Sequence, residues 1–413
     1  MKVKSHHPTI PLSFHLSDLL FLTTIAIIPI QLGKYFFSDS SYVLGIPIDY
    51  RAASIYLSDI VVSLFIPAFL WENRKNLKSI WEKYKSFISV LLVLNLYLIG
   101  SSLLTSNDNQ ISIIFNLKTL TFSMFAIFAA HSLSKKKIRE MALLVITVTS
   151  AVESLVIFAQ FALQKSLGLW ILGERAFDST TPLIAHLQFL GNQLLRPYGT
   201  FPHPNVAGAY LSFSLILLIG SQFRRKTANL LPLVISTLAL TLTFSRTAII
   251  ASIVGLVIIA NKFKFTTLLL LIAIIAGTTL IISQSLDVAP IAERLTLAQA
   301  ALNITLLNPL FGVGSNNFIL ELSRLNLFAL SETRLLQPAH NVFLLILAEN
   351  GIVGLLLFAT LLLVISKSIN DKIKLALFAA ILIFSTTDHF LWTLQQGRLM
   401  FWFAAAYIVS QEK

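Results

Sequence analysis

Residues 337–358 read Gln337-Pro-Ala-His-Asn-Val-Phe-Leu-Leu-Ile-Leu-Ala-Glu-Asn-Gly351-Ile-Val-Gly-Leu-Leu-Leu-Phe358. A polar segment ends at the proline, and an apolar run then continues to residue 366. A run of this length predicts a helix that crosses a bilayer. His340 would lie at the mouth of this helix, with Glu349 about 13 Å deeper at roughly 1.5 Å per residue. A histidine placed there can accept a proton, because its ordinary pKa is roughly 6.5.

The composition indicates a membrane protein. The 413 residues are 56% hydrophobic and 12% charged, whereas an average soluble domain is roughly 25% charged. Apolar runs recur along almost the whole chain, so we expect an all-α, multi-span protein with a single transmembrane domain, 1–413. The absence of cysteine excludes disulfides, thiolate nucleophiles and cysteine-based metal sites. In a membrane protein the distribution of the net charge of +12 matters more than its sum, and we expect no nucleic-acid partner.

The apolar runs divide into twelve expected spans. The first follows a basic start but is too long for a signal peptide and has no Ala-x-Ala exit, so we interpret it as uncleaved. The spans are expected at 16–32, 55–71, 87–104, 111–131, 141–163, 206–222, 228–244, 247–261, 266–284, 341–366, 373–388 and 397–411. Two long external segments remain, 164–205 and 285–340, and the second, between spans nine and ten, includes an expected helix at 291–307.

The basic residues predict the orientation. Twenty of the 31 lysines and arginines fall in short alternate segments that we assign to the cytoplasm, and ten fall on the opposite side. This bias places both termini in the cytoplasm. Sixteen of the inner charges are lysine, whereas eight of the outer ones are arginine, whose planar fork matches phosphate oxygens. Any one outer arginine can simply pair with a carboxylate or a lipid headgroup, but the set indicates an anionic ligand outside the membrane.

One external corner reads Arg196-Pro-Tyr-Gly-Thr-Phe-Pro-His-Pro-Asn205. Its prolines and glycine exclude a regular helix. They predict a rigid turn that carries Arg196, His203 and Asn205. An alternative is a stiff helix start with Asn205 as the N-cap.

A second external feature is Ser245-Arg246, between two short spans. About sixteen residues per span give roughly 24 Å of helix, less than the roughly 30 Å of a bilayer core. Arg246 should therefore lie slightly sunk at headgroup depth, where a charge needs a partner. That partner is either an ordinary lipid phosphate or the phosphate of a lipid-linked substrate.

The segment Asn308-Pro-Leu-Phe-Gly-Val-Gly-Ser-Asn-Asn-Phe318 contains two glycines separated by one residue. This spacing allows a close approach of the backbone to a ligand. Because the segment follows no strand, it does not indicate a dinucleotide site.

Among the ionisable residues within expected spans, four need partners or a water-filled cavity: Asp59, Lys118, Glu153 and Glu349. Asp59, Lys118 and Glu349 are expected to form structural pairs, whereas Glu153 has no evident partner. The adjacent Asp388 and His389 are too little to predict a metal site, and no His/Asp/Glu cluster at ligand spacing accompanies them. We therefore expect neither a metal nor a cofactor.

Together these motifs resemble the O-antigen ligase superfamily of bacterial membrane glycosyltransferases. The resemblance rests on Arg196-Pro-Tyr-Gly-Thr-Phe with Asn205, Ser245-Arg246, Asn308-Pro-Leu-Phe-Gly-Val-Gly314, His340-Asn341, Glu349-Asn-Gly-Ile-Val-Gly354 and Leu57-Ser-Asp59. It extends from about residue 57 to residue 358 and so covers most of the chain.

The resemblance implies a twelve-span fold of the GT-C kind, in the inner (cell) membrane, with its active site on the periplasmic or external face. It also implies metal-independent transfer of a glycan from a polyprenyl (undecaprenyl) diphosphate carrier to an acceptor hydroxyl on a lipid, protein or glycan. The residues that the resemblance implies as catalytic are His340, Arg246 and Arg196. Those that it implies as substrate-binding are Asn205, His203, Asn341, Arg334, Tyr198 and Glu349.

Other functions remain open at this point. A polysaccharide polymerase and a protein O-oligosaccharyltransferase belong to the same superfamily. A transporter or flippase of lipid-linked oligosaccharides is the alternative from another class. It would predict paired inverted repeats and broken helices at mid-membrane, and the sequence indicates neither.

Overall fold

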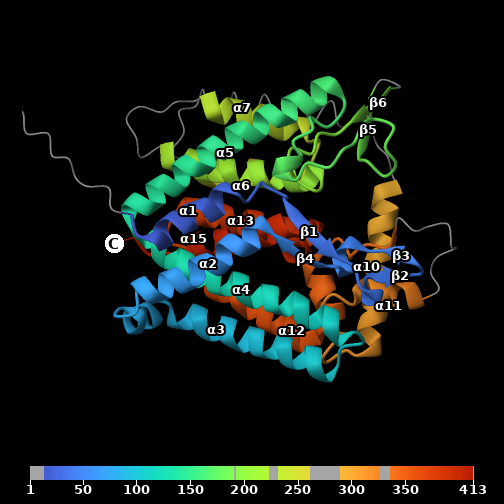
Figure 1. The fold of residues 1–413 in the computed structure, drawn as a ribbon, viewed down its shortest axis with the longest axis horizontal. Coiled ribbons are helices and arrows are strands. Elements are labelled where there is room, and N and C mark those ends of the chain that lie inside the picture. Colours follow the sequence, from blue (N-terminus) through green and yellow to red (C-terminus); the bar gives the residue numbers. More distant parts are fainter. Residues whose placement is uncertain (1–13, 190–191, 223–230, 261–288, 326–334, 413) are drawn as a thin grey trace, which may run out of the picture.

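The computed structural model describes residues 14–189, 192–222, 231–260, 289–325 and 335–412. Most of these residues are helical, and the long helices lie side by side along the longest axis (Figure 1). The helices are α1 (Leu16–Ala26), α2 (Leu57–Glu72), α3 (Leu77–Leu104), α4 (Asn109–Ser134), α5 (Lys136–Leu163), α6 (Pro204–Gln222), α7 (Leu231–Leu242), α8 (Arg246–Ile259), α10 (Ala289–Leu307), α11 (Phe318–Arg324), α12 (Val342–Ser366), α13 (Lys372–Thr387), α14 (Phe390–Thr393) and α15 (Gln395–Val409). The strands are β1 (Gly33–Phe36), β2 (Tyr42–Val43), β3 (Ile46–Pro47), β4 (Ala53–Tyr56), β5 (His186–Phe189) and β6 (Asn192–Leu195), and short 3₁₀ turns lie at Asp39–Ser41, Asp49–Arg51 and Trp170–Leu172.

Within the described part of the chain, four helices are long and apolar enough to cross a membrane: α3, α4, α5 and α12. The apolar helices α1, α6, α7 and α8 are shorter. The expected ninth span, 266–284, lies outside the described residues. The number of twelve spans therefore stays a prediction.

The structure is mainly helical, as expected for the all-α class, but it also contains short strands that the sequence did not predict. Three two-stranded antiparallel sheets are present, β1 with β4, β2 with β3, and β5 with β6. The first expected span is also too long, because α1 ends at Ala26 and the chain continues into β1. Gly33 faces Tyr56 in the β1–β4 register, and a Cβ there would lie 2.6 Å from the Tyr56 ring. The lack of a side chain at Gly33 thus allows this sheet to close.

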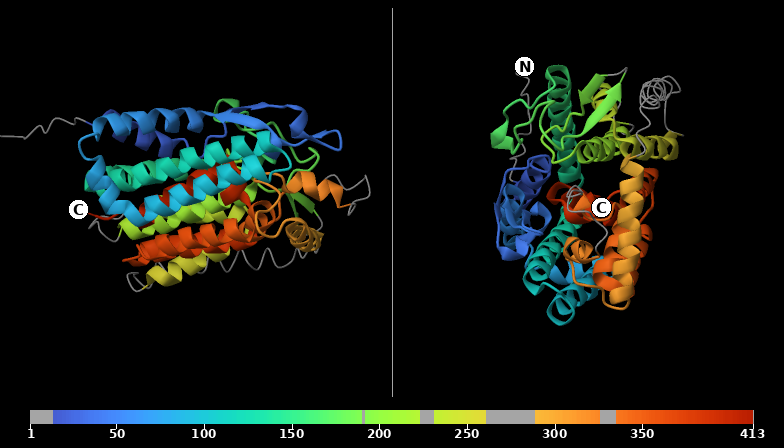
Figure 2. Two further views of the ribbon diagram at one scale, coloured as in Figure 1. Left: turned by 90° about the horizontal axis from the view of Figure 1, so that it is seen from below. Right: turned by 90° about the vertical axis from the view of Figure 1, so that its right-hand side faces the viewer.

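The connecting segments gather at two opposite ends of the bundle. One end carries the α2–α3 turn and the C-terminal end of the chain, and the other carries the strands with α10 and α11 (Figure 1; Figure 2). α10, at the position of the helix expected in 285–340, runs across this second end rather than along the bundle (Figure 2). The segments expected outside the membrane thus lie together at the strand-bearing end.

Phenylalanine side chains fill part of the interior between α1, α2 and α4. Phe65 packs against Phe21, with ring centroids 6.0 Å apart, and against Phe125 at 5.8 Å. Phe69 stacks on Phe128 at 4.5 Å. Close packing of this kind holds helices together where lipid removes most of the hydrophobic driving force.

Helix α12 is broken at Gly351, whose φ of 63° and ψ of −171° are not helical. The break is filled by the preceding loop. Gly314 N donates to Glu349 O at 2.8 Å, and Ile352 N donates to Pro309 O at 2.9 Å. The expectation of a continuous helix was therefore wrong, because backbone groups of the loop take the place of a helical turn.

The two glycines of 308–318 make this insertion possible. A Cβ on Gly312 would lie 2.3 Å from the carbonyl carbon of Glu349, and one on Gly314 would lie 2.3 Å from Ser106 Oγ. Both residues have positive φ, 74° and 100°. The close approach that we expected toward a ligand is instead an approach to α12 and to the turn between α3 and α4.

The pairing expected inside the bundle is confirmed for one pair. Lys118 Nζ lies 2.9 Å from Asp59 Oδ2. Glu349 does not join this pair; its carboxylate accepts a hydrogen bond from Phe318 N at 3.3 Å, which ties α11 to the broken part of α12.

Candidate active site at the strand-bearing end

Helix α5 holds the Arg196–Asn205 corner in place. Gln160 Oε1 accepts hydrogen bonds from Tyr198 N at 2.9 Å and from Gly199 N at 2.8 Å. About two turns earlier in α5, the Glu153 carboxylate accepts from Thr200 N at 3.0 Å and from Thr200 Oγ1 at 2.7 Å. Glu153, for which the sequence indicates no partner, therefore anchors the corner.

Glycine is required at the tip of this corner. Gly199 has a φ of 61°, and a Cβ there would lie 2.6 Å from Glu153 Oε2. Any side chain would strain the backbone and push the anchoring carboxylate away.

Three of the expected site residues are joined through a residue that was not expected. Arg196 Nη2 donates to Asn205 Oδ1 at 2.9 Å, and Asn205 Nδ2 donates to Asp388 Oδ2 at 3.1 Å. The other oxygen, Asp388 Oδ1, lies 3.4 Å from His340 Nδ1. Arg196 Nε also donates to Thr243 O at 3.0 Å. A polar chain thus runs from the guanidinium of Arg196 to the imidazole of His340. Its first two links are hydrogen bonds, whereas the contact from Asp388 to His340 Nδ1 lacks hydrogen-bond geometry.

Asp388 and His389 close this arrangement at the C-terminal end of α13. Asp388 Oδ1 accepts from His389 N at 2.8 Å, and His389 Nδ1 lies 2.7 Å from Thr393 Oγ1. The His389 ring contacts two others, with centroids 5.0 Å from His340 and 5.5 Å from Tyr50. These contacts leave the carboxylate of Asp388 between two imidazoles.

Burial determines the protonation states of the ionisable groups in and around this polar chain. Burial, with the positive charge of Arg196, lowers the pKa of His203 to about 3, and burial lowers the pKa of His389 to about 3. Both rings are therefore neutral at neutral pH. Burial and the charges of Arg246 and Arg294 lower the pKa of Arg196 to about 10, so it stays protonated. A poorly hydrated cation beside two others is a favourable place for an anion.

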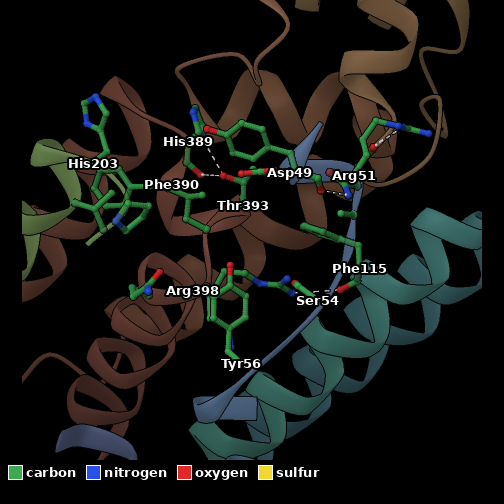
Figure 3. Close-up of a pocket in the computed structure, with 18 of the residues that line it drawn as sticks. Asp49, Arg51, Ser54, Tyr56, Phe115, His203, His389, Phe390, Thr393 and Arg398 are labelled. Atoms are coloured by element: carbon green, nitrogen blue, oxygen red, sulfur yellow. Dashed lines mark hydrogen bonds between the residues drawn. The ribbon is translucent and has the colours of Figure 1, made fainter. Parts of the chain in front are cut away.

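A cavity of about 330 Å³ opens beside this polar chain. Its volume is within the range of roughly 300–1,000 Å³ that small-ligand sites occupy. His203, Asn205, His340 and Asp388 line it together with residues from the segment between α1 and α2 and from the start of α15. Figure 3 shows His203 and His389 on one side of it and Arg398, Tyr56 and Ser54 on the other.

Other expected site residues lie near the polar chain but do not line the cavity. Arg246 is exposed and begins α8, after Ser245 as its N-cap, and its charge acts on Arg196. The Tyr198 ring packs on Phe177 with centroids 5.0 Å apart.

The remaining expected residues cap or stabilise helices, or lie outside the described residues. Asn341 is the N-cap of α12, and its Oδ1 accepts from Leu344 N at 3.0 Å. Glu349 is buried at the α12 break. Arg334 lies outside the described residues.

The alternative reading of Asn205 as an N-cap was wrong. Helix α6 begins at Pro204, so Asn205 lies inside its first turn. Asn205 N donates instead to His203 Nδ1 at 3.0 Å. This leaves the Asn205 side chain free to bridge Arg196 and Asp388.

The structure brings together a His/Asp/His cluster that the sequence spacing hides. The ligand atoms of His340, Asp388 and His389 lie within 4.8 Å of one another, so these residues could hold a metal ion. The expectation that no such cluster forms was wrong, because α12 and α13 bring together residues that are distant in the sequence. In the structure the three residues contact one another. Asp388 also contacts Asn205, and His389 also contacts Thr393 and Tyr50.

Apolar helices of spanning length and a polar cavity at one end of the bundle define an integral membrane protein. The family model described as O-antigen ligase matches residues 231–359. The match supports the O-antigen ligase superfamily, whose members include ligases and other glycan-transferring membrane enzymes. It includes Arg246 and His340, whereas Arg196 and Asp388 lie outside it. No curated protein matches the sequence.

Proposed function

We propose that this protein transfers a glycan from a polyprenyl (undecaprenyl) diphosphate carrier to an acceptor hydroxyl. The strand-bearing end of the bundle would face the periplasm or the cell exterior, with both termini in the cytoplasm. The observation that carries the proposal is the polar chain Arg196–Asn205–Asp388–His340 beside the cavity. This chain provides a charged group for the leaving diphosphate and an imidazole for the acceptor proton.

In this proposal Arg196 and Arg246 bind the diphosphate, and Arg294 adds a third positive charge. Guanidinium groups bind phosphate oxygens through parallel hydrogen bonds, and they stabilise the charge that develops as the diphosphate leaves. The hydrogen bonds that Arg196 donates to Asn205 Oδ1 and to Thr243 O fix its guanidinium fork before the donor binds. These guanidinium groups, rather than a metal ion, neutralise the leaving group.

His340 is the proposed base. Its Nδ1 faces Asp388, so Nε2 is the nitrogen that accepts the proton of the acceptor hydroxyl. The hydroxyl oxygen forms a bond to the anomeric carbon while the bond from that carbon to the diphosphate oxygen breaks. Asp388 stabilises the imidazolium that forms, as a carboxylate does behind a catalytic histidine. A single displacement of this kind inverts the anomeric centre, and product analysis that shows retention would refute it.

The proposal is tested by mass spectrometry of glycoconjugates from cells that carry the protein, lack it, or carry His340→Ala. Cells with the protein should contain one class of glycosylated lipid, protein or glycan that disappears in the other two strains. The lipid-linked donor should accumulate in both. The matched control is His186→Ala, because His186 is a half-buried residue of β5 that does not line the cavity and whose ring contacts Ser179 O. Unchanged products in the His340→Ala strain would contradict the assigned role.

The same experiment separates the enzyme from a flippase. A flippase defect would leave the donor on the cytoplasmic side of the membrane, whereas a transfer defect leaves it on the outer side, where an added periplasmic glycosidase can reach it. The identity of the glycosylated product also distinguishes a ligase, a polymerase and a protein O-oligosaccharyltransferase.

A further inference from the structure

We propose that the side of the cavity around Arg398 is a binding subsite for an acidic sugar residue, one that carries a carboxylate or a phosphate. The assignment of that sugar to the glycan acceptor rests on the proposed function. The subsite itself rests on the contacts of Arg398, on the charges around it and on the start of α15.

Arg398 is a buried cation that forms no ion pair within the described parts of the chain. It is 4% exposed, and no carboxylate lies within 4 Å of it among the described residues. Its Nη2 donates to Phe115 O at 3.2 Å and to Thr119 Oγ1 at 2.6 Å, which leaves the donors of Nε and Nη1 for another acceptor. The guanidinium lies 4.4 Å from the ring centroid of Phe115 and 5.3 Å from that of Phe122. A buried charge of this kind is costly unless an anion joins it.

The other cations on this side of the cavity are already paired. Lys118 lies 2.9 Å from Asp59, and Arg175 lies 2.9 Å from Asp49. Among the described residues that line the cavity, Arg51, Lys118 and Arg175 thus each have a carboxylate partner, and Arg398 has none within 4 Å. A ligand with a single negative charge would balance it.

The start of α15 adds uncharged donors at the same place. The first hydrogen bond inside the helix runs from Arg398 N to Leu394 O at 2.8 Å, so the amides of residues 395–397 precede it. Such amides and the helix dipole favour an anion. Gln396 also lines the cavity, and its buried Nε2 has no acceptor within the described parts of the chain. Gln396, with a buried donor that lacks an acceptor among the described residues, and Arg398 therefore line the same cavity.

The surrounding walls suit a sugar ring. Tyr56 and Phe115 line the cavity beside Arg398, and apolar walls with a few polar groups are typical of small-ligand sites. Figure 3 shows Arg398 and Tyr56 across the cavity from His203 and His389. A ligand anchored at Arg398 would therefore extend toward His340. Arg196 and Arg246 do not line this cavity, so the anchored group belongs to the acceptor rather than to the donor diphosphate.

Ligand-induced thermal stabilisation of the purified full-length protein in detergent tests the subsite. The probes are methyl glucuronide, glucose 1-phosphate and neutral methyl glucoside. At least one acidic probe should raise the melting temperature and the neutral probe should not; the acidic probe that acts identifies the anion. Arg398→Gln should raise the concentration for half-maximal stabilisation at least about tenfold, since hydrogen bonds to charged groups contribute roughly 1.5–3 kcal/mol. Arg324→Gln should leave it unchanged, because Arg324 is exposed, pairs with Glu321 and does not line the cavity.

Equal stabilisation by acidic and neutral probes would overturn the proposal, as would full stabilisation of folded Arg398→Gln. If Arg398→Gln does not fold, Arg398→Lys and Arg196→Gln decide the matter. The lysine variant should keep weaker stabilisation by the acidic probe, and Arg196→Gln should keep all of it. Loss in Arg196→Gln would place the ligand at the donor site and refute the subsite. The stabilisation assay measures binding and not transfer, so the two proposals can fail separately. If the acidic probe stabilises the protein through Arg398 but the protein transfers no glycan, the proposed function is refuted and the subsite remains.

Discussion

Substitution of Gly199 by alanine should destabilise the protein through two separate effects. The first is the backbone, because alanine at a φ of 61° costs about 1 kcal/mol. The second is contact, because the new Cβ would lie 2.6 Å from Glu153 Oε2. Moving that carboxylate weakens its hydrogen bonds from Thr200 N and Oγ1, and a bond to a charged group contributes roughly 1.5–3 kcal/mol. The expected total is about 3 kcal/mol.

Gly45→Ala is the matched control. Gly45 also has a positive φ, 77°, but a Cβ there would meet nothing within 4 Å. Only the backbone effect of about 1 kcal/mol should appear. In thermal unfolding followed by intrinsic fluorescence in detergent, Gly199→Ala should lower the midpoint about three times as far.

A double-mutant cycle isolates the contact with Glu153. In a Glu153→Ala background the carboxylate is absent, so Gly199→Ala should cost no more than Gly45→Ala. Equal midpoints for the two single glycine variants would refute the anchoring role of Glu153. A cost that is unchanged in the Glu153→Ala background would refute it as well.

Three further predictions concern charged groups in or near the polar chain of the candidate site. Asp388→Asn should slow glycan transfer roughly 10²–10³-fold, because the imidazolium of His340 loses its carboxylate; a rate within about twofold of the unchanged protein, by product mass spectrometry, would contradict this. Thermal stability should fall as pH drops below roughly 6.5, the ordinary pKa of a histidine in the unfolded chain. Below this pH the unfolded His203 and His389 take up protons, whereas the folded rings, with pKa values of about 3, stay neutral. The loss should reach up to about 1.4 kcal/mol per pH unit per histidine. His203→Gln should flatten that decline in midpoints measured between pH 7 and 5, and an unchanged slope would count against the neutral ring. Lys118→Met should cost about 2 kcal/mol by leaving a charge unpaired, and adding Asp59→Asn should restore most of it.

The sequence predicts the apolar helices well, because long uncharged runs have few alternatives in a membrane. It does not predict the break at Gly351. That break depends on a loop some forty residues earlier, and glycine is compatible with either an intact or a broken helix. The strands were missed for a similar reason: β1 and β4 are short, and each forms only because the other is present. The fold class was therefore right in its main feature and wrong at the strand-bearing end.

The candidate site was found in part. Arg196, Asn205 and His340 stood out because polar residues at the ends of apolar runs are few. Asp388 and His389 were set aside because two adjacent residues carry little information without their neighbours in space. Arg398 could not be singled out, since a buried unpaired cation is defined by the absence of partners in the structure. Glu153, in contrast, could have been recognised as an anchor only once the corner at Gly199 was placed against it.

The most direct test of the central claim is native mass spectrometry of the protein released from its own membranes. The unchanged protein and His340→Ala should carry a bound polyprenyl-diphosphate glycan, with more of it on His340→Ala because transfer is blocked. Arg196→Gln should lose it, since the diphosphate no longer meets the fork held by Asn205. Equal retention of the lipid by Arg196→Gln, or the absence of any diphosphate lipid from folded His340→Ala, would contradict the claim.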